Sequence, residues 1–337
     1  MTSHKRIGTV LLAVSALSLI ACAGTPTPAA SPTGESAVAH PEATLADTTA
    51  GPERIAFARA DNPLTEDFML WTSNIDGTEL RPVGNQSGYF PDWSPDRTHL
   101  LFDYFDESGI DHVATIRPDG SGFTQLTRGD EFAYNEAPDY APDGATIVFD
   151  RALVTEDEPG FTTTLWTMRA DGSDPQPLID TAEAGFDYEA EFSPDGAEIV
   201  FVRVDPTSGA TAVAVVGADG TGVRVLTPFS LLVEHPRWSP DGSTVIYNVE
   251  SRPALDLATN GIWTVPASGG TPARLLATDA TLHPFKPDYS PDGTRVLFAG
   301  AVGGMGGGEE LFVMNADGSG IQRLTTTDTY ENYPVWD

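Results

Sequence analysis

The string Pro236-Arg237-Trp238-Ser239-Pro240-Asp241-Gly242, which leads into an apolar run ending at Tyr247, decides the fold because close copies of it recur along the chain. In each full copy, a second aromatic residue stands nine positions after the first. The five full copies, 46 to 52 residues apart, run from Trp93 to Phe102, Tyr140 to Phe149, Phe192 to Phe201, Trp238 to Tyr247 and Tyr289 to Phe298. A period of this length is typical of the blades of a β-propeller.

A second motif lies between these copies. It consists of a short strand, a turn that is usually Asp-Gly five residues later, and an aliphatic residue seven positions beyond the turn. Its six copies are Trp71/Asp76/Val83, Ala114/Asp119/Leu126, Trp166/Asp171/Leu178, Ala214/Asp219/Leu226, Trp263/Ser268/Leu275 and Phe312/Asp317/Leu324. The two motifs together give four short segments separated by turns, which predicts a four-stranded blade.

The turn of the first motif suits a tight hairpin. Proline presets φ at the second position of the turn, and the glycine that follows Asp takes the left-handed position. Arg97 stands where the other copies have glycine. The strands after the turn, such as Ile147–Phe149 and Val245–Tyr247, are continuously apolar. This pattern predicts strands that neighbouring blades cover on both faces.

The two ends of the repeat region complement each other. Residues 54–57 match the second strand of a repeat that has no first strand before it, and Tyr330–Asp337 match a first strand and stop at the turn. Trp336 follows Tyr289 by 47 residues, in register with the other copies. We therefore predict an all-β, six-bladed β-propeller that is closed by pairing of its N- and C-terminal strands.

The first residues form an export signal. Lys5 and Arg6 precede an apolar stretch, and the string Leu19-Ile20-Ala21-Cys22 resembles the bacterial lipobox, in which the cysteine is lipid-modified. Cys22 is the only cysteine. The alternative is an incidental cysteine in an ordinary cleaved leader. We predict a lipoprotein signal peptide at 1–21, a lipid-anchored disordered linker rich in Ala, Pro, Thr and Ser at 22–52, and the propeller at 53–337.

The charge of the chain bounds its partners. A formal net charge of −31 argues against nucleic acid and against docking on anionic lipid heads, because both need basic patches. The membrane is then contacted only through the N-terminal lipid, and we expect a monomer. The acidic residues act either as a solubilising coat or as an attraction for cations or a basic partner.

Candidate binding residues follow from the loops. The connections between second and third strands vary in length, whereas the other hairpins do not, and variable loops on a rigid scaffold commonly bind ligands. We predict ligand binding at the channel mouth on this side, by Glu136, Asp187, Glu189, Glu234, His235, His283 and Glu331. No ligand spacing specifies a metal, no catalytic motif is present, and we expect no cofactor.

The strings Phe90-Pro91-Asp92-Trp93-Ser94-Pro95-Asp96 and Glu191-Phe192-Ser193-Pro194-Asp195-Gly196, together with Met314–Ser319, closely resemble the WD-like repeat of the TolB-type propellers. The resemblance covers nearly all of residues 53–337. It implies an extracytoplasmic six-bladed propeller that acts in protein interaction, as family members do with a peptidoglycan-associated lipoprotein.

Two hypotheses about function follow. The first is a noncatalytic propeller, anchored as a lipoprotein at the cell surface or in the periplasm, that binds an envelope protein, a peptide or a cell-wall glycan. The second is a carbohydrate-active enzyme, a lyase or hydrolase, with its centre at the channel mouth around His235 and His283.

Overall fold

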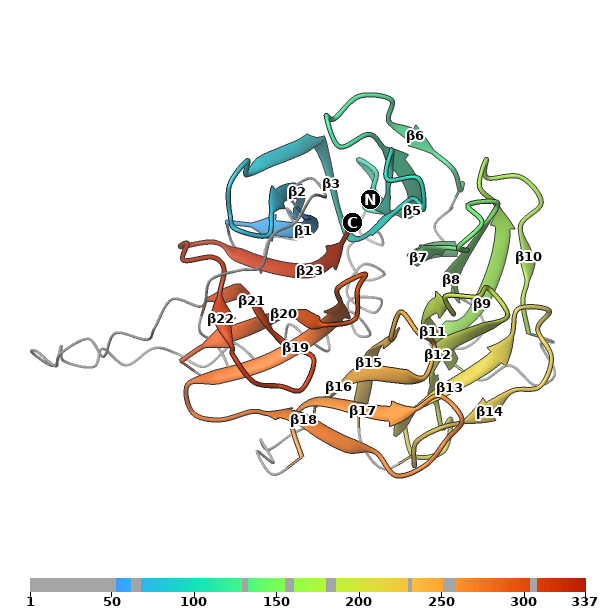
Figure 1. The fold of residues 1–337 in the computed structure, drawn as a ribbon. Helices are drawn as coiled ribbons and strands as arrows, with labels where there is room; N and C mark the ends of the chain where they lie inside the picture. Colours follow the sequence, from blue (N-terminus) through green and yellow to red (C-terminus); the bar gives the residue numbers. More distant parts are fainter. Residues whose placement is uncertain are drawn as a thin grey trace, which may run out of the picture.

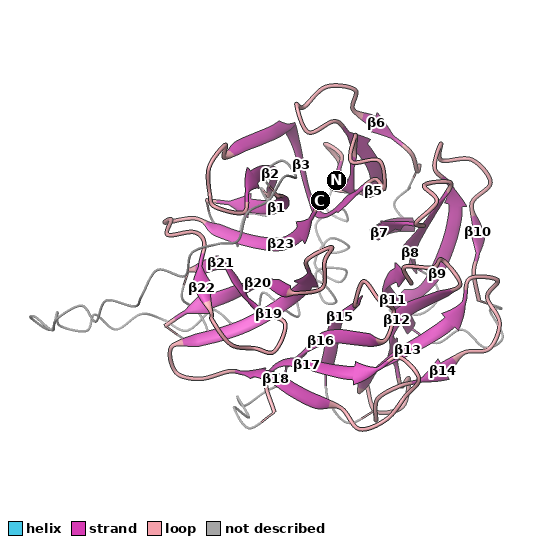
Figure 2. Ribbon diagram, in the orientation of Figure 1, coloured by secondary structure: helices cyan, strands magenta, loops and turns pink. Residues whose placement is uncertain are grey.

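The computed structural model describes residues 53–61, 68–128, 133–154, 161–179, 186–229, 232–250, 259–303 and 308–337. The described residues contain strands and turns and no helix. Six antiparallel four-stranded blades surround a central axis (Figures 1 and 2). The predicted fold class is therefore confirmed.

Each blade runs from an inner strand at the axis to a short outer strand at the rim. The strands, blade by blade and from inside outwards, are β23 (Tyr330–Trp336), β1 (Arg54–Ala60), β2 (Met69–Asn74) and the first part of β3 (Arg81–Trp93); the last part of β3, β4 (Leu100–Phe105), β5 (Asp111–Ile116) and β6 (Thr124–Gln125); β7 (Ala133–Tyr140), β8 (Thr146–Val154), β9 (Phe161–Arg169) and β10 (Gln176–Pro177); β11 (Phe186–Phe192), β12 (Glu198–Val204), β13 (Thr211–Gly217) and β14 (Arg224–Val225); β15 (Leu232–Trp238), β16 (Thr244–Glu250), β17 (Gly261–Pro266) and β18 (Ala273–Ala277); β19 (Leu282–Tyr289), β20 (Arg295–Val302), β21 (Glu309–Asn315) and β22 (Gln322–Arg323).

The ring is closed by the two ends of the propeller. β23 pairs antiparallel with β1, with Ile55 opposite Trp336 and Ala60 opposite Tyr330. β3 is long enough to be the outer strand of the first blade and the inner strand of the second, so these two blades share one continuous sheet. The predicted closure is confirmed, and no inner strand is left with an unpaired edge at the junction.

The core lies between blades. The second aromatic residue of each copy is at the centre of the second strand, where Phe102, Phe149, Phe201 and Phe298 are 0% exposed and Tyr247 is 2% exposed. Neighbouring blades pack on both faces of these strands, which explains why their sequences are apolar without alternation. Fully burying such a side chain contributes about 1.5–3 kcal/mol.

The Ser-Pro-Asp turns connect first and second strands, and we call the side of the ring that carries them the turn face. In the fifth blade the hydroxyl of Ser239 donates to Oδ1 of Asp241 at 2.6 Å, and the N–H of Gly242 donates to the carbonyl of Ser239 at 2.8 Å. Gly242 has φ of 68°, and Arg97 adopts the same left-handed conformation with φ of 59°. The predicted turn geometry is thus confirmed, including at the non-glycine copy.

The predicted signal peptide, Cys22 and the linker lie outside the described residues. In the described part of the chain, no helix is long and apolar enough to cross a membrane.

Removing Tyr330–Asp337 should open the ring. The deletion uncovers one edge of β1 and removes the buried side chains of Val335 and Trp336, which are 5% and 7% exposed. We expect a drop in Tm of about 10 °C or more, since large-to-small changes of this kind cost several kcal/mol. Differential scanning calorimetry measures it, with Gln322→Ala on an exposed outer strand as the control. An unchanged Tm for the deletion would show that closure does not stabilise the propeller.

Candidate functional site

Every inner strand carries a bulge at the same place. Three residues before its last aromatic residue, a non-glycine residue has a positive φ of 45° to 53°. The pairing register with the second strand shifts at this point, for example between Glu234 and Arg237. The six bulge residues are Phe90, Ala137, Glu189, His235, Lys286 and Tyr333. Backbone strain of this kind costs about 1–3 kcal/mol per residue and collects at functional sites.

The bulge residues close the channel at its middle, which we call the waist. Phe90 of the second blade and His235 of the fifth blade lie on opposite sides of the ring, yet their ring centroids are 5.9 Å apart. Tyr333 contacts both, at 4.2 Å from Phe90 and 5.8 Å from His235. The ammonium of Lys286 lies 3.2 Å from the centroid of the Tyr333 ring. Side chains that meet across the axis divide the channel into two halves.

On the turn-face side of the waist, acidic side chains join one blade to the next. Oδ2 of Asp92 accepts the backbone N–H of Tyr140 at 3.0 Å, across the boundary between the second and third blades. The same bond is made at three further boundaries, by Asp139 to Phe192 at 2.9 Å, Glu191 to Trp238 at 2.7 Å and Asp288 to Trp336 at 2.9 Å. We call these four bonds the blade clasps. Each one satisfies a backbone donor at the inner edge of a sheet.

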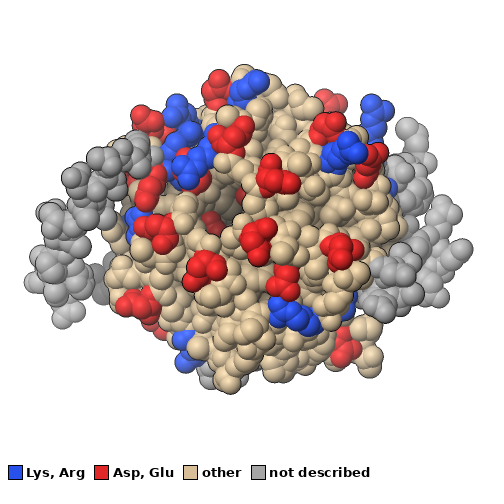
Figure 3. Space-filling model, turned by 45° about the vertical axis from the view of Figure 1, so that its right-hand side comes forward, with Lys and Arg blue, Asp and Glu red and all other residues tan. Residues whose placement is uncertain are grey.

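The clasp residues surround a cavity of about 330 Å³ that opens at the turn face. Its wall holds the four clasp carboxylates, Arg237 and the six aromatic residues that end the inner strands, and its rim holds prolines of the Ser-Pro-Asp turns. The space-filling view shows a hollow near the centre of the ring with acidic side chains around it and inside it (Figure 3). Below it, at the waist, two separate voids of about 20 Å³ each have room for about one water molecule.

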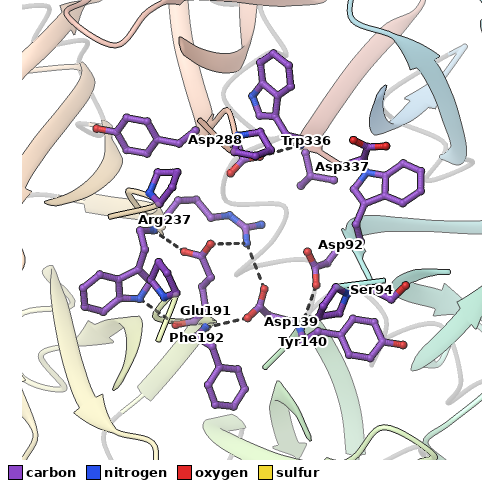
Figure 4. Close-up of a pocket in the computed structure, with 18 of the residues that line it drawn as sticks. Asp92, Ser94, Asp139, Tyr140, Glu191, Phe192, Arg237, Asp288, Trp336 and Asp337 are labelled. Carbon is purple, nitrogen blue, oxygen red and sulfur yellow. Dashed lines mark hydrogen bonds and ion pairs between the residues drawn. The ribbon is translucent and has the colours of Figure 1, made fainter. Parts of the chain in front are cut away.

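Arg237 replaces the clasp carboxylate in the fifth blade, and its side chain extends towards the middle of the cavity (Figure 4). Its Nη1 lies 3.9 Å from Oδ1 of Asp139 and 3.8 Å from Oε1 of Glu191. These ion pairs are longer than hydrogen bonds. The side chain of Arg237 is 21% exposed, and its guanidinium forms no hydrogen bond to any residue that the structure describes.

Burial changes the acidity of these carboxyls. Burial raises the pKa of Asp92 to about 6, of Asp288 to about 6 and of Glu191 to about 8. Burial, together with the charges of Asp92 and Glu191, also holds the pKa of Asp139 well above its usual range. Arg237 acts against these effects and lowers the pKa of all four groups. Perturbed carboxyls that share one cavity make this cavity the candidate functional site.

The predicted binding residues lie on the other side of the waist or within it. Glu189 and His235 belong to the waist, where Oε1 of Glu189 is 3.3 Å from Nδ1 of His235 and Oε2 accepts the His235 N–H at 2.7 Å. Burial raises the pKa of Glu189 to about 7 and lowers that of His235 well below its usual value. The structure therefore brings these two together, in the wall of one small void.

Three further predicted residues are paired with nearby side chains of the scaffold. Asp187 forms a bidentate ion pair with Arg203, with both bonds at 2.8 Å. Glu331 is 0% exposed and lies 3.8 Å from Arg59, and His283 bonds Thr278 at 3.0 Å.

Glu136 and Glu234 complete the predicted set. Both are half-buried; desolvation raises the pKa of Glu136, and the charge of Glu234 acts on Lys286. None of the seven predicted residues lines the cavity of about 330 Å³.

Sequence reasoning missed the residues that do line it. Six of them occupy one position of the repeat, directly before the aromatic residue that ends each inner strand: Asp92, Asp139, Glu191, Arg237, Asp288 and Val335. The repeated acidic residue at that position was an available signal. Among the described residues, no group of three or more His, Cys, Asp and Glu side chains has the geometry to hold a metal ion.

Comparison with known proteins supports the fold. The family model described as the TolB beta propeller domain matches residues 53–284. A Tol-Pal system protein TolB of Anaeromyxobacter dehalogenans is 31% identical over 120 residues, which are 35% of this chain and 25% of that protein. The matched parts of this and other curated relatives are at most 58% of their lengths.

Two solved structures share the fold. TolB from Acinetobacter baumannii is 22% identical with a TM-score of 0.67, covering 84% of this chain and 66% of that chain. An oligogalacturonate lyase from Vibrio parahaemolyticus is 15% identical with a TM-score of 0.53, covering 77% of this chain and 71% of that chain. At these identities the likeness shows the fold alone.

Stability should fall as pH rises from 6.5 to 8. A carboxyl whose pKa is raised in the folded state binds more protons there, so its stabilising effect is lost as pH rises through the folded pKa. Glu191, with a pKa of about 8, and Glu189, at about 7, act in this window. His235 acts in the opposite sense only near and below its usual value of 6.5. Thermal unfolding at constant ionic strength measures the change, and a Tm that rises over this window would contradict the assignment.

Arg237→Gln should make this dependence steeper. Without the guanidinium the pKa values of the four clasp carboxyls rise further, so the loss in Tm should be larger at pH 8 than at pH 6. Arg169→Gln is the matched control, since Arg169 pairs with Asp174 on the surface, where both are 70% exposed. Equal losses of Tm at both pH values for Arg237→Gln would show that Arg237 does not balance these charges.

Proposed function

This chain belongs to the TolB β-propeller family, and we propose that it is a noncatalytic binding module of the bacterial envelope that recognises a protein, a peptide or a cell-wall glycan. The observation that carries the proposal is the cavity of about 330 Å³ at the centre of the turn face. It is closed below by the waist, so it receives the end of a ligand or one projecting group rather than a chain that threads through the ring.

The wall of the cavity is built for rigid recognition. Each clasp carboxylate is fixed by a backbone N–H of the next blade, so its orientation is set before a ligand arrives. Fixed polar groups lower the ordering cost of binding. The lining serine, Ser94, donates its hydroxyl to Asp96 at 2.7 Å, and no histidine, cysteine or lysine is among the lining residues. This lining supplies contacts without a base-activated nucleophile.

The location completes the proposal. We propose that the chain is exported, that Cys22 carries the lipid anchor, and that residues 22–52 give the propeller reach from the membrane. One relative of this chain is named as a protein of the Tol-Pal system, which fits a role in envelope protein interaction. The propeller acts as a monomer with its turn face towards the partner.

A carbohydrate-active enzyme is the second candidate. Glu191, with a pKa of about 8, lies in one cavity with Asp92 and Asp288, at about 6, and a raised acid beside a lower one is the arrangement of general acid–base catalysis. The acidic wall repels uronate polymers, so the substrate would be a neutral or amino sugar. Turnover of such oligosaccharides that disappears in Glu191→Gln would establish this function in place of the first.

Affinity capture from solubilised envelope tests the proposal. With the purified full-length chain as bait, we expect a saturable partner that is lost in the double variant Asp92→Asn/Asp288→Asn, because those carboxylates line the cavity. Asparagine keeps an oxygen that can accept the clasp bond, so the fold should be retained. Glu234→Gln, on the other side of the waist, is the comparison variant. If Glu234→Gln abolishes capture and the double variant does not, the binding site is on the loop side that the sequence indicated.

A further inference from the structure

Each clasp carboxyl has a second oxygen that the clasp bond does not use. In each one, a single oxygen holds the backbone N–H of the next blade, namely Oδ2 of Asp92, Asp139 and Asp288 and Oε2 of Glu191. The second oxygens of Asp139 and Glu191 face Arg237 at 3.9 and 3.8 Å. No side-chain donor in the described part of the chain bonds the second oxygen of Asp92 or Asp288. Two of the second oxygens therefore face Arg237, and two more, on Asp92 and Asp288, have no side-chain donor among the described residues.

The wall also holds a donor group that lacks close acceptors. The side chain of Arg237 reaches the cavity and is 21% exposed, and in the described part of the chain its guanidinium forms two ion pairs at 3.8 and 3.9 Å and no hydrogen bond. Acceptor atoms on a ligand would satisfy its N–H groups. A bare metal ion has none.

The cavity thus favours a ligand with three properties. It brings positive charge, since the lining residues include five carboxyls against two guanidiniums. It also brings acceptor atoms beside that charge, and it fits end-on into a space closed at the waist. A basic side chain on a polypeptide has all three, because its ammonium or guanidinium is followed by an apolar stem and then by backbone carbonyls. The aromatic residues of the wall suit the stem and the cation.

We propose that the cavity binds a lysine or arginine side chain of a protein partner, inserted end-on at the centre of the turn face. This inference rests on the proposed binding function and names the chemistry of its ligand. The ammonium or guanidinium donates hydrogen bonds to Asp92 and Asp288, while the backbone of the partner lies over the proline rim.

Short peptides test the inference directly. The probes are acetyl-Gly-Gly-Lys-Gly-Gly-amide, its arginine counterpart and the same peptide with Nε-acetyl-lysine, titrated into the full-length protein by calorimetry and by the fluorescence of the tryptophans in the wall. We expect saturable binding of the lysine and arginine peptides and at least tenfold weaker binding of the acetylated peptide, which has the same stem without the charge. Binding of a cation lowers the pKa of Glu191 and Asp139, so protons are released at pH 7, and the measured enthalpy should depend on the buffer.

Variants locate the site. Asp92→Asn/Asp288→Asn should weaken the lysine peptide at least tenfold without lowering Tm, since both carboxyls have raised pKa values and gain from neutralisation. Asp328→Asn, on the exposed segment between β22 and β23, removes a charge elsewhere and should leave the affinity unchanged.

Several outcomes overturn the inference. Equal binding of the lysine and acetyl-lysine peptides does so, as does the absence of saturable peptide binding, or tighter binding of a glucosamine oligosaccharide than of either basic peptide. These results leave the proposed function standing if envelope capture still depends on the cavity. Failure of capture, in contrast, rejects the proposed function whatever the peptides do.

Discussion

The hydrogen bond from a backbone N–H of one blade to an acidic side chain of the blade before it is the interaction on which the rest of this structure depends. Blades are joined mainly by apolar packing, which is non-directional. The clasps add direction, because a buried N–H must find an acceptor and a side-chain oxygen of the preceding blade supplies it. An acceptor from the preceding blade reaches that N–H only from the inner edge of the sheet. Joining the blades in this way therefore gathers Asp92, Asp139, Glu191 and Asp288 around the axis.

The two boundaries without a clasp carboxylate have different explanations. At the boundary between the first and second blades Val335 stands at the clasp position, and there β3 continues from one sheet into the next, so the backbone itself joins the blades. At the boundary between the fifth and sixth blades the residue is Arg237, which turns towards Asp139 and Glu191 instead. A fifth carboxylate would raise the repulsion among the others. The guanidinium of Arg237 at this position instead reduces the repulsion among the four clasp carboxyls.

The sequence was sufficient for the fold and not for the site. Spacing alone predicted the blades, the turns and the pairing of β1 with β23, because each follows from local patterns repeated along the chain. Loop variation directed attention to the beginning of the inner strands, whereas the cavity lies where those strands end. The acidic residue before each terminal aromatic was visible in the repeat. The role of that acidic residue could not be predicted from the sequence. It depends on the bulge that turns Phe90 and His235 towards each other, and the bulge is a property of the paired strands and their register.

The clasps also bear on whether the cavity binds or catalyses. A carboxyl that holds a backbone N–H with one oxygen has little freedom to rotate, which favours recognition through fixed acceptors over attack on a substrate. The raised pKa values of Glu191 and Asp139 mean that the empty cavity holds charge at a cost, and a cationic ligand removes part of that cost. The blade clasps therefore bury several carboxyl groups without enough positive charge nearby to balance them. Arg237 supplies one cation from within the chain, and the cavity leaves space for a second from a partner.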